Sequence, residues 1–419
     1  MNIRKRANRS NPFFFRIDST KDRIGGYGVK RFLFFLLALV FVFSYGCFLC
    51  AASDDETEDV VLTPTAGNLA LDARGAILVE ASTGTVLYEQ NPDESFPPAS
   101  VTKVMTLLLV IEALDAGKFT LSDPVTVSEY AASMGGSQVF LSPGETLSVE
   151  DMIKCAVISS ANDAAVALAE FVAGSEEAFV NEMNRRAAEL GMTGAHFENV
   201  TGLDDSTVDN RCSARDIALM SRALISHKEI LKYSSTWMDS IRDGEFTLTN
   251  TNRLVRFYRG ALGLKTGSTA KAKFCLSAVA ERDGMTLIAV VMGSPSRDVR
   301  NEETKRLLDY GFANYAVFHE KATELPAVKT LGGTSDYCLV GYDGVSCVVS
   351  RGEAKKIERE IVLPASISAP IEAGDVVGRA VFRSGDRVVG EVPIKALEPV
   401  ARISFPGLLV KLFRAVVLG

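Results

Sequence analysis

Apolar residues in two parts of the chain come in pairs of short runs that are separated by turn residues. Residues 76–81 and 86–89 form one such pair around a Ser-Thr-Gly-Thr turn, which predicts a β-hairpin. Residues 274–280 and 286–292 form a second pair, and the Asp-Gly dipeptide between them is typical of a tight hairpin turn. We expect these segments to belong to an antiparallel sheet.

The residues between the two hairpins follow a helical pattern. Residues 98–116 are apolar on nearly every face, which favours a helix buried in the core. Residues 150–230 form a helical block, in which Ser175 and Ser213 are expected to be N-cap residues. A further helix is expected at 299–313. Strands, then helices, then strands and a last helix indicate an α+β fold in which helices pack on an antiparallel sheet.

The α+β region is expected to span residues 67–320, and the chain changes character after it. Residues 321–400 are rich in Val, Ile, Gly and Pro in short alternating runs, which predicts a small all-β domain. Residues 401–419 end the chain in an apolar stretch whose charges, Lys411 and Arg414, share one helix face. This tail is too short to span a bilayer. We expect an amphipathic helix on the membrane surface, with a terminal helix docked on the β-domain as the alternative.

The N-terminal segment, residues 1–52, has the order of a secretory signal. Basic residues precede an apolar run at 32–52 that ends in small residues, and acidic residues follow. Residues 53–66 are acidic and poor in apolar side chains, which indicates a linker. An uncleaved membrane anchor is the alternative, because the apolar run approaches the ~20 residues that span a bilayer. Both interpretations place the rest of the chain at the outer face of the cytoplasmic membrane, because the positive flank stays inside.

The composition is that of an ordinary globular protein, with 419 residues, of which 47% are hydrophobic and 23% charged. The formal net charge of −7 argues against a nucleic-acid partner. We expect no metal and no cofactor, because no Cys/His spacing suits zinc and no Gly-rich phosphate loop is present. The chain has only three histidines, His196, His227 and His319, so a Ser-His-Asp triad has few candidates. Any serine chemistry is therefore expected to use another base.

Two of the seven cysteines lie in the N-terminal segment, and the odd number that follows it does not suggest a disulfide framework. Cys155 and Cys275 lie in apolar runs and are expected to be packing residues. Cys338 and Cys347 flank a predicted hairpin turn at 342–344. A disulfide between these two residues is an open alternative.

Three short motifs stand in order along the α+β region: Ser100-Val101-Thr102-Lys103, Ser160-Ala161-Asn162 and Lys265-Thr266-Gly267. Each motif is weak alone, but each has a fitting context. The first opens the buried helix, where a lysine has no ordinary reason to be. The second follows an apolar run and precedes an Ala-rich helix, and the third lies on a predicted strand beside the second hairpin. Motifs of this kind, in this order, are the signature of penicillin-binding proteins and class A β-lactamases.

The spacing of the first motif suits an activated serine nucleophile. Ser100 and Lys103 are three residues apart on a helix, so the lysine amine can reach the serine hydroxyl. A serine needs a nearby base before it can attack a carbonyl. A lysine can be that base near neutral pH only if its pKa falls by about 3 units from the ordinary value of ~10.4. Burial and the like charge of Lys265 would both lower the pKa of Lys103.

The other two motifs have possible roles around this pair. Ser160 can pass a proton to the leaving amine, and Asn162 can orient Lys103 and the substrate amide. Lys265 can attract a substrate carboxylate as well as repel a charge on Lys103. Gly267 has no side chain, so an extended peptide can lie along that strand edge and pair with it.

The backbone N–H groups of Ser100 and Ser268 are candidates for an oxyanion hole. Each motif also has a purely structural interpretation. Ser100 can be a helix cap, Lys103 a surface lysine whose amine reaches water, the second motif a helix start, and Lys265 and Thr266 solvated edge-strand residues. Three independent matches in order, each in a fitting context, favour the enzyme.

Over residues 65–400 the chain resembles the D-alanyl-D-alanine carboxypeptidases, the low-molecular-mass penicillin-binding proteins. Beyond the three motifs, the resemblance includes Pro97–Thr106, Gly135-Gly136-Ser137, Asn162–Ala165, Gly202-Leu203-Asp204, Ser213–Asp216 and Gly263–Gly267. It implies a β-lactamase/transpeptidase-like catalytic domain, a β-domain and an amphipathic C-terminal anchor. It also implies removal of the last D-alanine from peptidoglycan stem pentapeptides without a metal, and acylation by β-lactam antibiotics.

The resemblance implies a role for ten residues of this chain. It makes Ser100 the acylated nucleophile and Lys103 its base, with Ser160 and Asn162 in the proton network. The residues that it places against substrate are Lys265, Thr266, Gly267, Ser268, Arg253 and Arg300, the two arginines near the carboxylate end. The residue after Lys-Thr-Gly varies in the family, so a side-chain role for Ser268 does not follow.

Three other functions remain open at the level of the sequence. A β-lactamase would share the acylation step but would hydrolyse its acyl-enzyme quickly. A non-catalytic binding or sensing module could keep the fold without the reaction. An endopeptidase that cuts cross-links would use the same chemistry. The second domain argues against the first of these, and the complete motifs argue against the second.

Overall fold

The computed structural model describes residues 69–204 and 210–417. The predicted signal segment at 1–52 and the linker at 53–66 lie outside the described residues.

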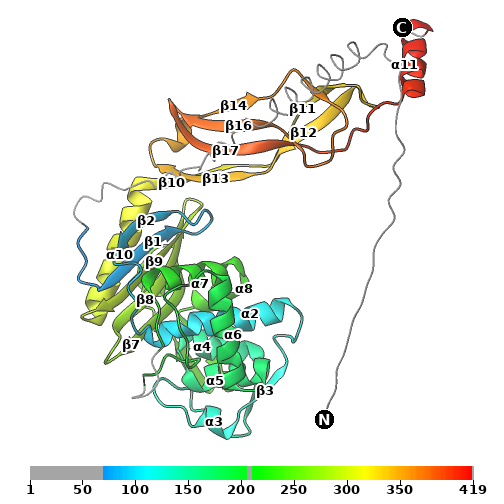
Figure 1. Ribbon diagram of the computed structural model, residues 1–419. Helices are drawn as coiled ribbons and strands as arrows, with labels where there is room; N and C mark the ends of the chain where they lie inside the picture. Colours follow the sequence, from blue (N-terminus) through cyan, green and yellow to red (C-terminus); the bar gives the residue numbers. More distant parts are fainter. Residues whose placement is uncertain (1–68, 205–209, 418–419) are drawn as a thin grey trace, which may run out of the picture. The chain divides into compact units, whose positions relative to one another are not determined.

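A five-stranded antiparallel sheet forms the centre of the α+β region (Figure 1). Its strand order is β2-β1-β9-β8-β7, and the strands are β1 (Gly75–Glu80), β2 (Val86–Gln90), β7 (Ala261–Thr269), β8 (Lys273–Arg282) and β9 (Met285–Ser294). Both predicted hairpins are confirmed, β1 with β2 and β8 with β9. The Asp283-Gly284 turn has positive φ at both residues, as a tight two-residue hairpin turn requires. Strand β7 is an edge strand, so one side of it is open for pairing.

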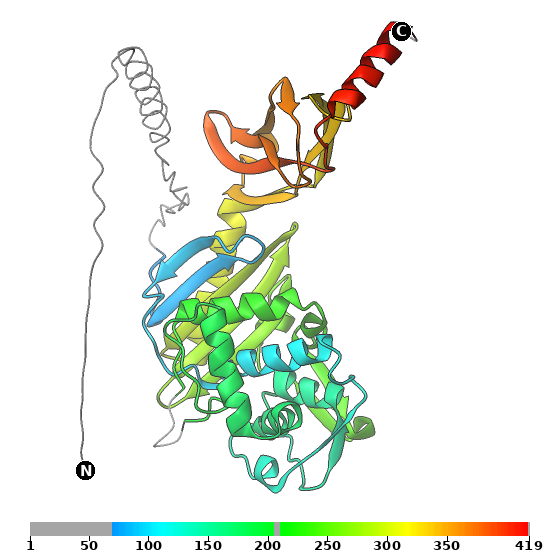
Figure 2. The ribbon, with the colours of Figure 1, turned by 45° about the vertical axis from the view of Figure 1, so that its right-hand side comes forward.

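Helices cover both faces of this sheet, because its strands are apolar on both sides. Ile77 and Val290 face a core that is shared with the helical cluster, whereas Leu78 and Val291 face a second core that they share with Leu307. The helical cluster comprises α2 (Lys103–Asp115), α4 (Val149–Ile158), α5 (Asn162–Ala173), α6 (Glu176–Glu189), α7 (Ala214–Ser226) and α8 (Glu229–Ser234). The opposite face carries α10 (Arg297–Asn314), the helix expected at 299–313, and Figure 2 shows the sheet between the two layers.

The helix predicted at 98–116 is confirmed as a core helix, with one difference at its start. Ten of the 13 residues of α2 are buried. The preceding residues form a 3-10 turn, η1 (Ala99–Thr102), instead of the first turn of the α-helix. Ala99, the residue before Ser100, has a φ of 50°, a left-handed conformation that is uncommon for a residue with a side chain. The serine of the first motif therefore stands on a tight turn that leads into the helix.

The predicted N-caps are confirmed. The Ser175 hydroxyl accepts from the Ala178 N–H at the start of α6. At the start of α7, Ser213 and Asp216 form a capping box in which each side chain accepts from the other's backbone N–H. Smaller elements complete this region: β3 (Pro124–Thr126), α3 (Glu129–Ala132), β4 (Thr146–Ser148), β5 (Met238–Ile241), η2 (Arg242–Gly244), β6 (Phe246–Thr249) and α9 (Leu254–Phe257).

The chain beyond α10 is built of strands, as expected from its alternating pattern. A six-stranded sheet has the order β14-β16-β17-β12-β11-β15, and β10 pairs with β13 in a two-stranded sheet. The strands are β10 (Tyr315–Glu320), β11 (Thr323–Leu331), β12 (Tyr337–Tyr342), β13 (Val345–Ser350), β14 (Ile357–Val362), β15 (Ser366–Ser368), β16 (Val376–Ser384) and β17 (Arg387–Ala396), with one 3-10 turn, η3 (Ala354–Lys356). A separate small core, which includes Val340, Phe382 and Ile394, holds them together. The α+β fold class followed by an all-β domain is confirmed.

The hairpin predicted around residues 342–344 is wrong. Strand β12 pairs with β11 and β17, whereas β13 pairs with β10, so the two consecutive strands enter different sheets. The short loop turns the chain from one sheet to the other instead of folding the strands onto each other. Cys338 and Cys347, which these strands carry, are both free thiols, so the disulfide considered from the sequence is not formed.

The C-terminal tail forms helix α11 (Phe405–Val417). Large apolar side chains along it are exposed, among them Phe405, Leu409, Phe413 and Val416. Lys411 forms an ion pair with Asp336. Among residues 69–204 and 210–417, no helix combines the length and the hydropathy that a membrane crossing needs.

Candidate active site

The three sequence motifs meet at one place in the fold. The η1 turn and the first residue of α2 present Ser100 and Lys103, and the junction between α4 and α5 presents Ser160 and Asn162. The edge strand β7 presents Lys265. These segments are far apart in the sequence, and hydrogen bonds between their side chains join them at the site.

Lys103 is fully buried and is held by three oxygens from three segments. Its Nζ lies 3.3 Å from Ser100 Oγ, one turn earlier in the chain. The same nitrogen donates to Asn162 Oδ1 at 2.5 Å and to the Thr201 carbonyl at 2.8 Å. These contacts fix the amine against the serine hydroxyl and leave it little freedom to swing away. The structure therefore excludes the alternative that Lys103 is a surface lysine whose amine reaches water.

Burial lowers the pKa of Lys103 well below its ordinary value, and the nearby positive charge of Lys265 lowers it further. Asp163 acts in the opposite sense, but its effect is smaller. The pKa of Lys265 itself falls to about 7, because it is buried and because Arg300 is close. The sequence expectation that burial and Lys265 depress the pKa of Lys103 is confirmed. The lowered pKa favours the uncharged amine, the form that can accept a proton from Ser100.

Lys265 connects the second motif to the third. Its Nζ donates to Ser160 Oγ at 2.7 Å and to the Thr266 carbonyl at 3.0 Å. Ser160 has a φ of 63°, so the chain leaves α4 through a left-handed residue that turns the hydroxyl toward the lysine. Thr266 donates its hydroxyl to Thr251 at 2.8 Å.

Two glycines allow the backbone segments to approach the nucleophile. A Cβ on Gly267 would lie 2.7 Å from the Pro98 carbonyl and 3.0 Å from the Ser100 nitrogen, so β7 packs directly on the start of η1. A Cβ on Gly202 would lie 1.8 Å from the Ala99 carbonyl, and Gly202 has a φ of 75°. Gly267 is also the residue expected to let a peptide pair with the strand edge, and its contact with η1 is a further reason for a glycine at this position.

Asn162 is itself held in place from two sides. Its Nδ2 donates to the Gly135 carbonyl at 2.7 Å, and its backbone nitrogen donates to the Ser137 carbonyl at 2.7 Å. The neighbouring carboxylate of Asp163, fully buried, accepts from the backbone N–H groups of Val139 and Leu141. The loop at 135–141 is thus attached to the start of α5, and the amide that contacts Lys103 is oriented by that loop.

A cavity of about 570 Å³ opens over these groups. Seven of the ten sequence-predicted residues line it: Ser100, Ser160, Arg253, Thr266, Gly267, Ser268 and Arg300. The other three, Lys103, Asn162 and Lys265, do not line it and lie buried behind Ser100 and Ser160. The structure thus brings all ten predicted residues to one site.

Sequence reasoning missed several residues of this cavity. Trp237, Phe257 and Arg297 line it, and Thr201 contributes the carbonyl that holds Lys103. The carbonyl of Thr201 carries no side-chain signal, although the neighbouring Gly202 belongs to the resemblance noted above. Trp237 and Phe257 lie on segments without a motif, and nothing in their local sequence points to the site.

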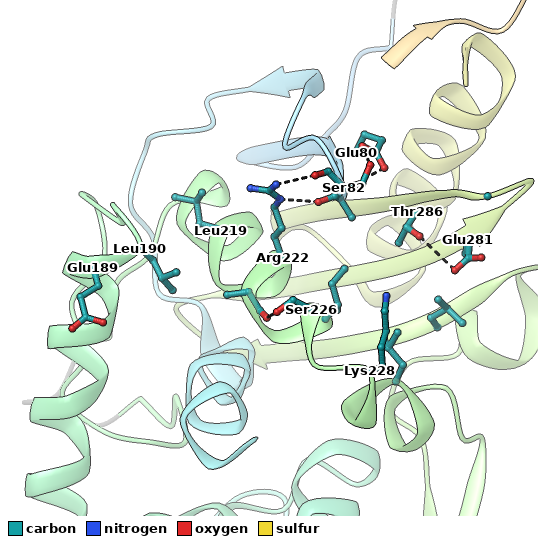
Figure 3. A pocket seen from close by; sticks show the side chains of 16 residues that line it. Glu80, Ser82, Glu189, Leu190, Leu219, Arg222, Ser226, Lys228, Glu281 and Thr286 are labelled. Atoms are coloured by element: carbon teal, nitrogen blue, oxygen red, sulfur yellow. Dashed lines mark hydrogen bonds between the residues drawn. The ribbon is translucent and has the colours of Figure 1, made fainter. Parts of the chain in front are cut away.

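A second cavity, of about 610 Å³, lies beside α7 and α8 and contains none of the motif residues (Figure 3). Arg222 reaches across its wall and donates to the carbonyls of Ala81 at 2.7 Å and Ser82 at 3.1 Å. The guanidinium therefore ties α7 to the β1–β2 turn.

Two family models match separate parts of the chain. The model of the D-alanyl-D-alanine carboxypeptidase family matches residues 62–296, and that of the penicillin-binding protein 5 C-terminal domain matches residues 318–402. The chain belongs to the D-alanyl-D-alanine carboxypeptidase family. This confirms the resemblance drawn from the motifs.

Relatives of this carboxypeptidase family match over most of their length. The chain is 42% identical over 344 residues to D-alanyl-D-alanine carboxypeptidase DacF of Bacillus subtilis, covering 80% of this chain and 88% of DacF. It is 34% identical to DacA of Escherichia coli, covering 87% of this chain and 92% of DacA. A crystal structure of penicillin binding protein 5 from Haemophilus influenzae superposes with a TM-score of 0.72 at 29% identity, covering 80% of this chain and 98% of that one.

Proposed function

We propose that this protein is a serine D-alanyl-D-alanine carboxypeptidase in which Ser100 carries the acyl group. The observation that carries the proposal is the buried Lys103 amine, which lies 3.3 Å from Ser100 Oγ with its pKa far below the ordinary value. Family membership gives the reaction class, and the geometry supports the residue roles.

In the acylation step, Ser100 Oγ attacks the carbonyl carbon of the penultimate D-alanine while Lys103 Nζ takes the hydroxyl proton. The new C–O bond forms as the carbonyl π-bond opens. The oxyanion faces the backbone N–H groups of Ser100 and Ser268, the proposed oxyanion hole. Collapse of the tetrahedral adduct breaks the C–N bond, and the terminal D-alanine leaves as an amine.

The leaving amine needs a proton, and Ser160 is the proposed donor. Lys265 Nζ donates to Ser160 Oγ at 2.7 Å, so the serine hydroxyl can give its proton to the amine while it accepts from the lysine. The D-alanine carboxylate lies toward Lys265, Arg253 and Arg300, whose positive charges attract it. Lys265 replaces the proton that Ser160 gave, and the proton on Lys103 passes back to the Ser160–Lys265 pair, so that Lys103 is neutral again. Water then attacks the acyl carbonyl while Lys103 takes its proton, the bond between the acyl carbon and Ser100 Oγ breaks, and Lys103 returns the proton to Ser100 as the shortened stem peptide leaves.

Two further parts of the proposal concern ligands and location. β-Lactams are expected to acylate Ser100, since the ampicillin-bound structure of Penicillin-Binding Protein D2 from Listeria monocytogenes is 33% identical to this chain and superposes with a TM-score of 0.54, covering 58% of this chain and 99% of that one. The exposed apolar side chains of α11 favour attachment to a membrane surface, and Arg414 would face its anionic headgroups. The signal-like order of residues 1–52 favours export to the outer face of the cytoplasmic membrane.

A β-lactamase is the rival function with the same first step. The match to the penicillin-binding protein 5 C-terminal domain favours the carboxypeptidase. Penicillin turnover separates the two, because a carboxypeptidase keeps a stable acyl adduct whereas a β-lactamase releases penicilloate continuously.

Mass spectrometry of the penicillin-treated protein tests the proposal. One adduct is expected, on the peptide that contains Ser100, together with release of D-alanine from a diacyl-Lys-D-Ala-D-Ala peptide. Ser100→Ala is expected to abolish both. Ser268→Ala, which removes a second hydroxyl from the same cavity but keeps the backbone N–H, should retain the adduct. An adduct on another residue, or labelling that survives Ser100→Ala, would show that the nucleophile is misassigned.

A further inference from the structure

Three arginines gather at one end of the active-site cavity, one more than the sequence predicted. Arg253 precedes α9, and Arg297 and Arg300 lie in the first turn of α10. All three line the cavity. Arg253 and Arg297 are exposed, whereas Arg300 is only 3% exposed. Since residues three apart share a helix face, Arg297 and Arg300 present their charges together.

The positive charge of this cluster is not neutralised within the part of the chain that the structure describes. None of the three guanidinium groups has a carboxylate within ion-pair distance there, and Arg300 donates only to neutral oxygens, those of Asn301 and the Cys275 carbonyl. Asp298 lies between the two helix arginines but pairs with neither. Burial and the charges of Arg297 and Arg253 lower the pKa of Arg300 to about 10, while the charge of Asp298 acts in the opposite sense and less strongly.

The place of Arg297 is unfavourable for the fold itself. It is the first residue of α10, where the helix dipole already presents a partial positive charge, so a cation there is destabilising. The Arg297 side chain is exposed, so packing does not offset this cost, and it has no ion pair among the described residues. A bound anion in the cavity would compensate for all three charges together.

The substrate of the proposed reaction supplies too little negative charge for this cluster. A stem peptide that ends in D-Ala-D-Ala brings one carboxylate to the leaving-group end, where Lys265, Arg253 and Arg300 are proposed to attract it. Arg297, which also lines the cavity, then remains without a partner. A leaving group with a second carboxylate could form an ion pair with this arginine.

We propose that Arg297 makes the leaving-group end of the cavity selective for a leaving amine that carries a second carboxylate. This inference rests on the carboxypeptidase function proposed above. The second carboxylate has two possible sources, the side chain of an acidic terminal residue such as D-glutamate, or the far peptide of a cross-link. Both present the same chemistry to Arg297, an additional carboxylate attached to the amine that departs from the acyl-enzyme.

The test compares two peptides that differ only in that charge, diacetyl-L-Lys-D-Ala-D-Glu and diacetyl-L-Lys-D-Ala-D-Gln. For the wild-type protein, kcat/KM is expected to be roughly fivefold higher with terminal D-Glu, the scale of one solvent-screened ion pair. In Arg297→Gln the ratio should fall to about one, while kcat/KM for D-alanine release falls by less. Raising the salt concentration should reduce the wild-type ratio, because screening weakens the pair.

The matched control is Arg306→Gln, which removes an exposed arginine from the same helix without touching the cavity. It should leave the D-Glu to D-Gln ratio at its wild-type value. A ratio of one in the wild type, or an equal loss in both variants, would overturn the proposal. A protein that releases no D-alanine from D-Ala-D-Ala either would instead refute the carboxypeptidase function.

A second arm distinguishes the two sources of the carboxylate. A cross-linked dimeric peptide and its form with the far carboxylates amidated are compared in the same way. A preference for the free acid that disappears in Arg297→Gln identifies the cross-link as a source. A preference confined to the D-Glu peptide identifies the acidic terminal residue instead.

Discussion

The catalytic region and the C-terminal β-region differ most in what they bury. The core around α2 encloses ionisable side chains, among them Lys103, Asp163 and Lys265. Within the described residues beyond 314, no charged side chain is buried, and lysines such as Lys395 lie at the surface.

This difference indicates that the catalytic region gives up some folding stability in order to hold its reactive side chains. Burying an amine costs free energy unless it is neutral or well paired. The catalytic region accepts that cost at two lysines and orients both with hydrogen bonds. The described part of the β-region buries apolar strand faces instead and contains no buried lysine. We therefore expect equivalent substitutions in the two regions to have very different effects.

Replacing a lysine should show the largest contrast. Lys103→Met removes the proposed base and is expected to slow acylation by penicillin by about 10³-fold, within the range for loss of a general base. Lys395→Met in the β-region removes a lysine that pairs with Asp343 at the surface and should leave acylation unchanged. Stopped-flow acylation measures both. Comparable acylation rates in the two variants would show that the buried Lys103 amine is not needed for acylation.

Replacing a glycine should show a smaller contrast. Gly202 and Gly374 both have positive φ, but a Cβ would lie 1.8 Å from the Ala99 carbonyl at the first and meets nothing within 4 Å at the second. Gly374→Ala is expected to cost about 1 kcal/mol of stability from backbone strain alone. Gly202→Ala should cost about 3 kcal/mol or more, because η1 must move. Urea unfolding followed by acylation kinetics checks both values. If the two substitutions cost the same, the close approach at Ala99 is not tight in solution.

The buried lysines should also shape the pH dependence. The pKa of Lys265 is about 7, so this residue loses its charge as the pH rises through neutrality and attracts a substrate carboxylate less strongly. Acylation by penicillin should therefore decline above about pH 7. Lys265→Arg keeps its charge throughout, and its profile should lack that decline. A decline that persists in the variant would assign it to another group.

The smallest catalytic effect is expected at the C-terminus. Deleting residues 402–419 removes α11 and its exposed apolar side chains, and should release the processed protein from membranes. Its kcat/KM for D-alanine release should stay within about twofold of the full chain, because α11 contributes no residue to the cavity. Membrane flotation and the peptide assay measure the two results. Continued membrane binding after the deletion would identify the N-terminal segment as the anchor.

The sequence predicted the residues whose type and spacing carry the chemistry. Ser100, Lys103 and Lys265 stand in motifs whose spacing has a geometric reason, and the structure brings them together. The caps at Ser175 and Ser213 were predictable because each depends on contacts within one helical turn.

Features that depend on distant contacts were not predictable in this way. The sheet to which β13 pairs depends on β10, which is far from it in sequence, so the Asp-Gly dipeptide at 343–344 indicated a hairpin that does not form. The 3-10 turn at Ser100 also departs from the helix that the apolar pattern favoured. Trp237 and Arg297 reach the cavity through tertiary packing alone.

The free cysteines have a practical consequence for experiments on this enzyme. Burial raises the pKa of the thiols of Cys212, Cys338 and Cys347, and that of Cys275 to about 11. Cys155 is shifted in the same direction. Because only thiolates react readily with alkylating reagents, these five positions should stay silent when the folded catalytic and β-regions are treated with maleimides. A cysteine introduced at an exposed cavity position would then take a fluorescent reporter in preference to these five, and substrate arrival could be followed without first removing them.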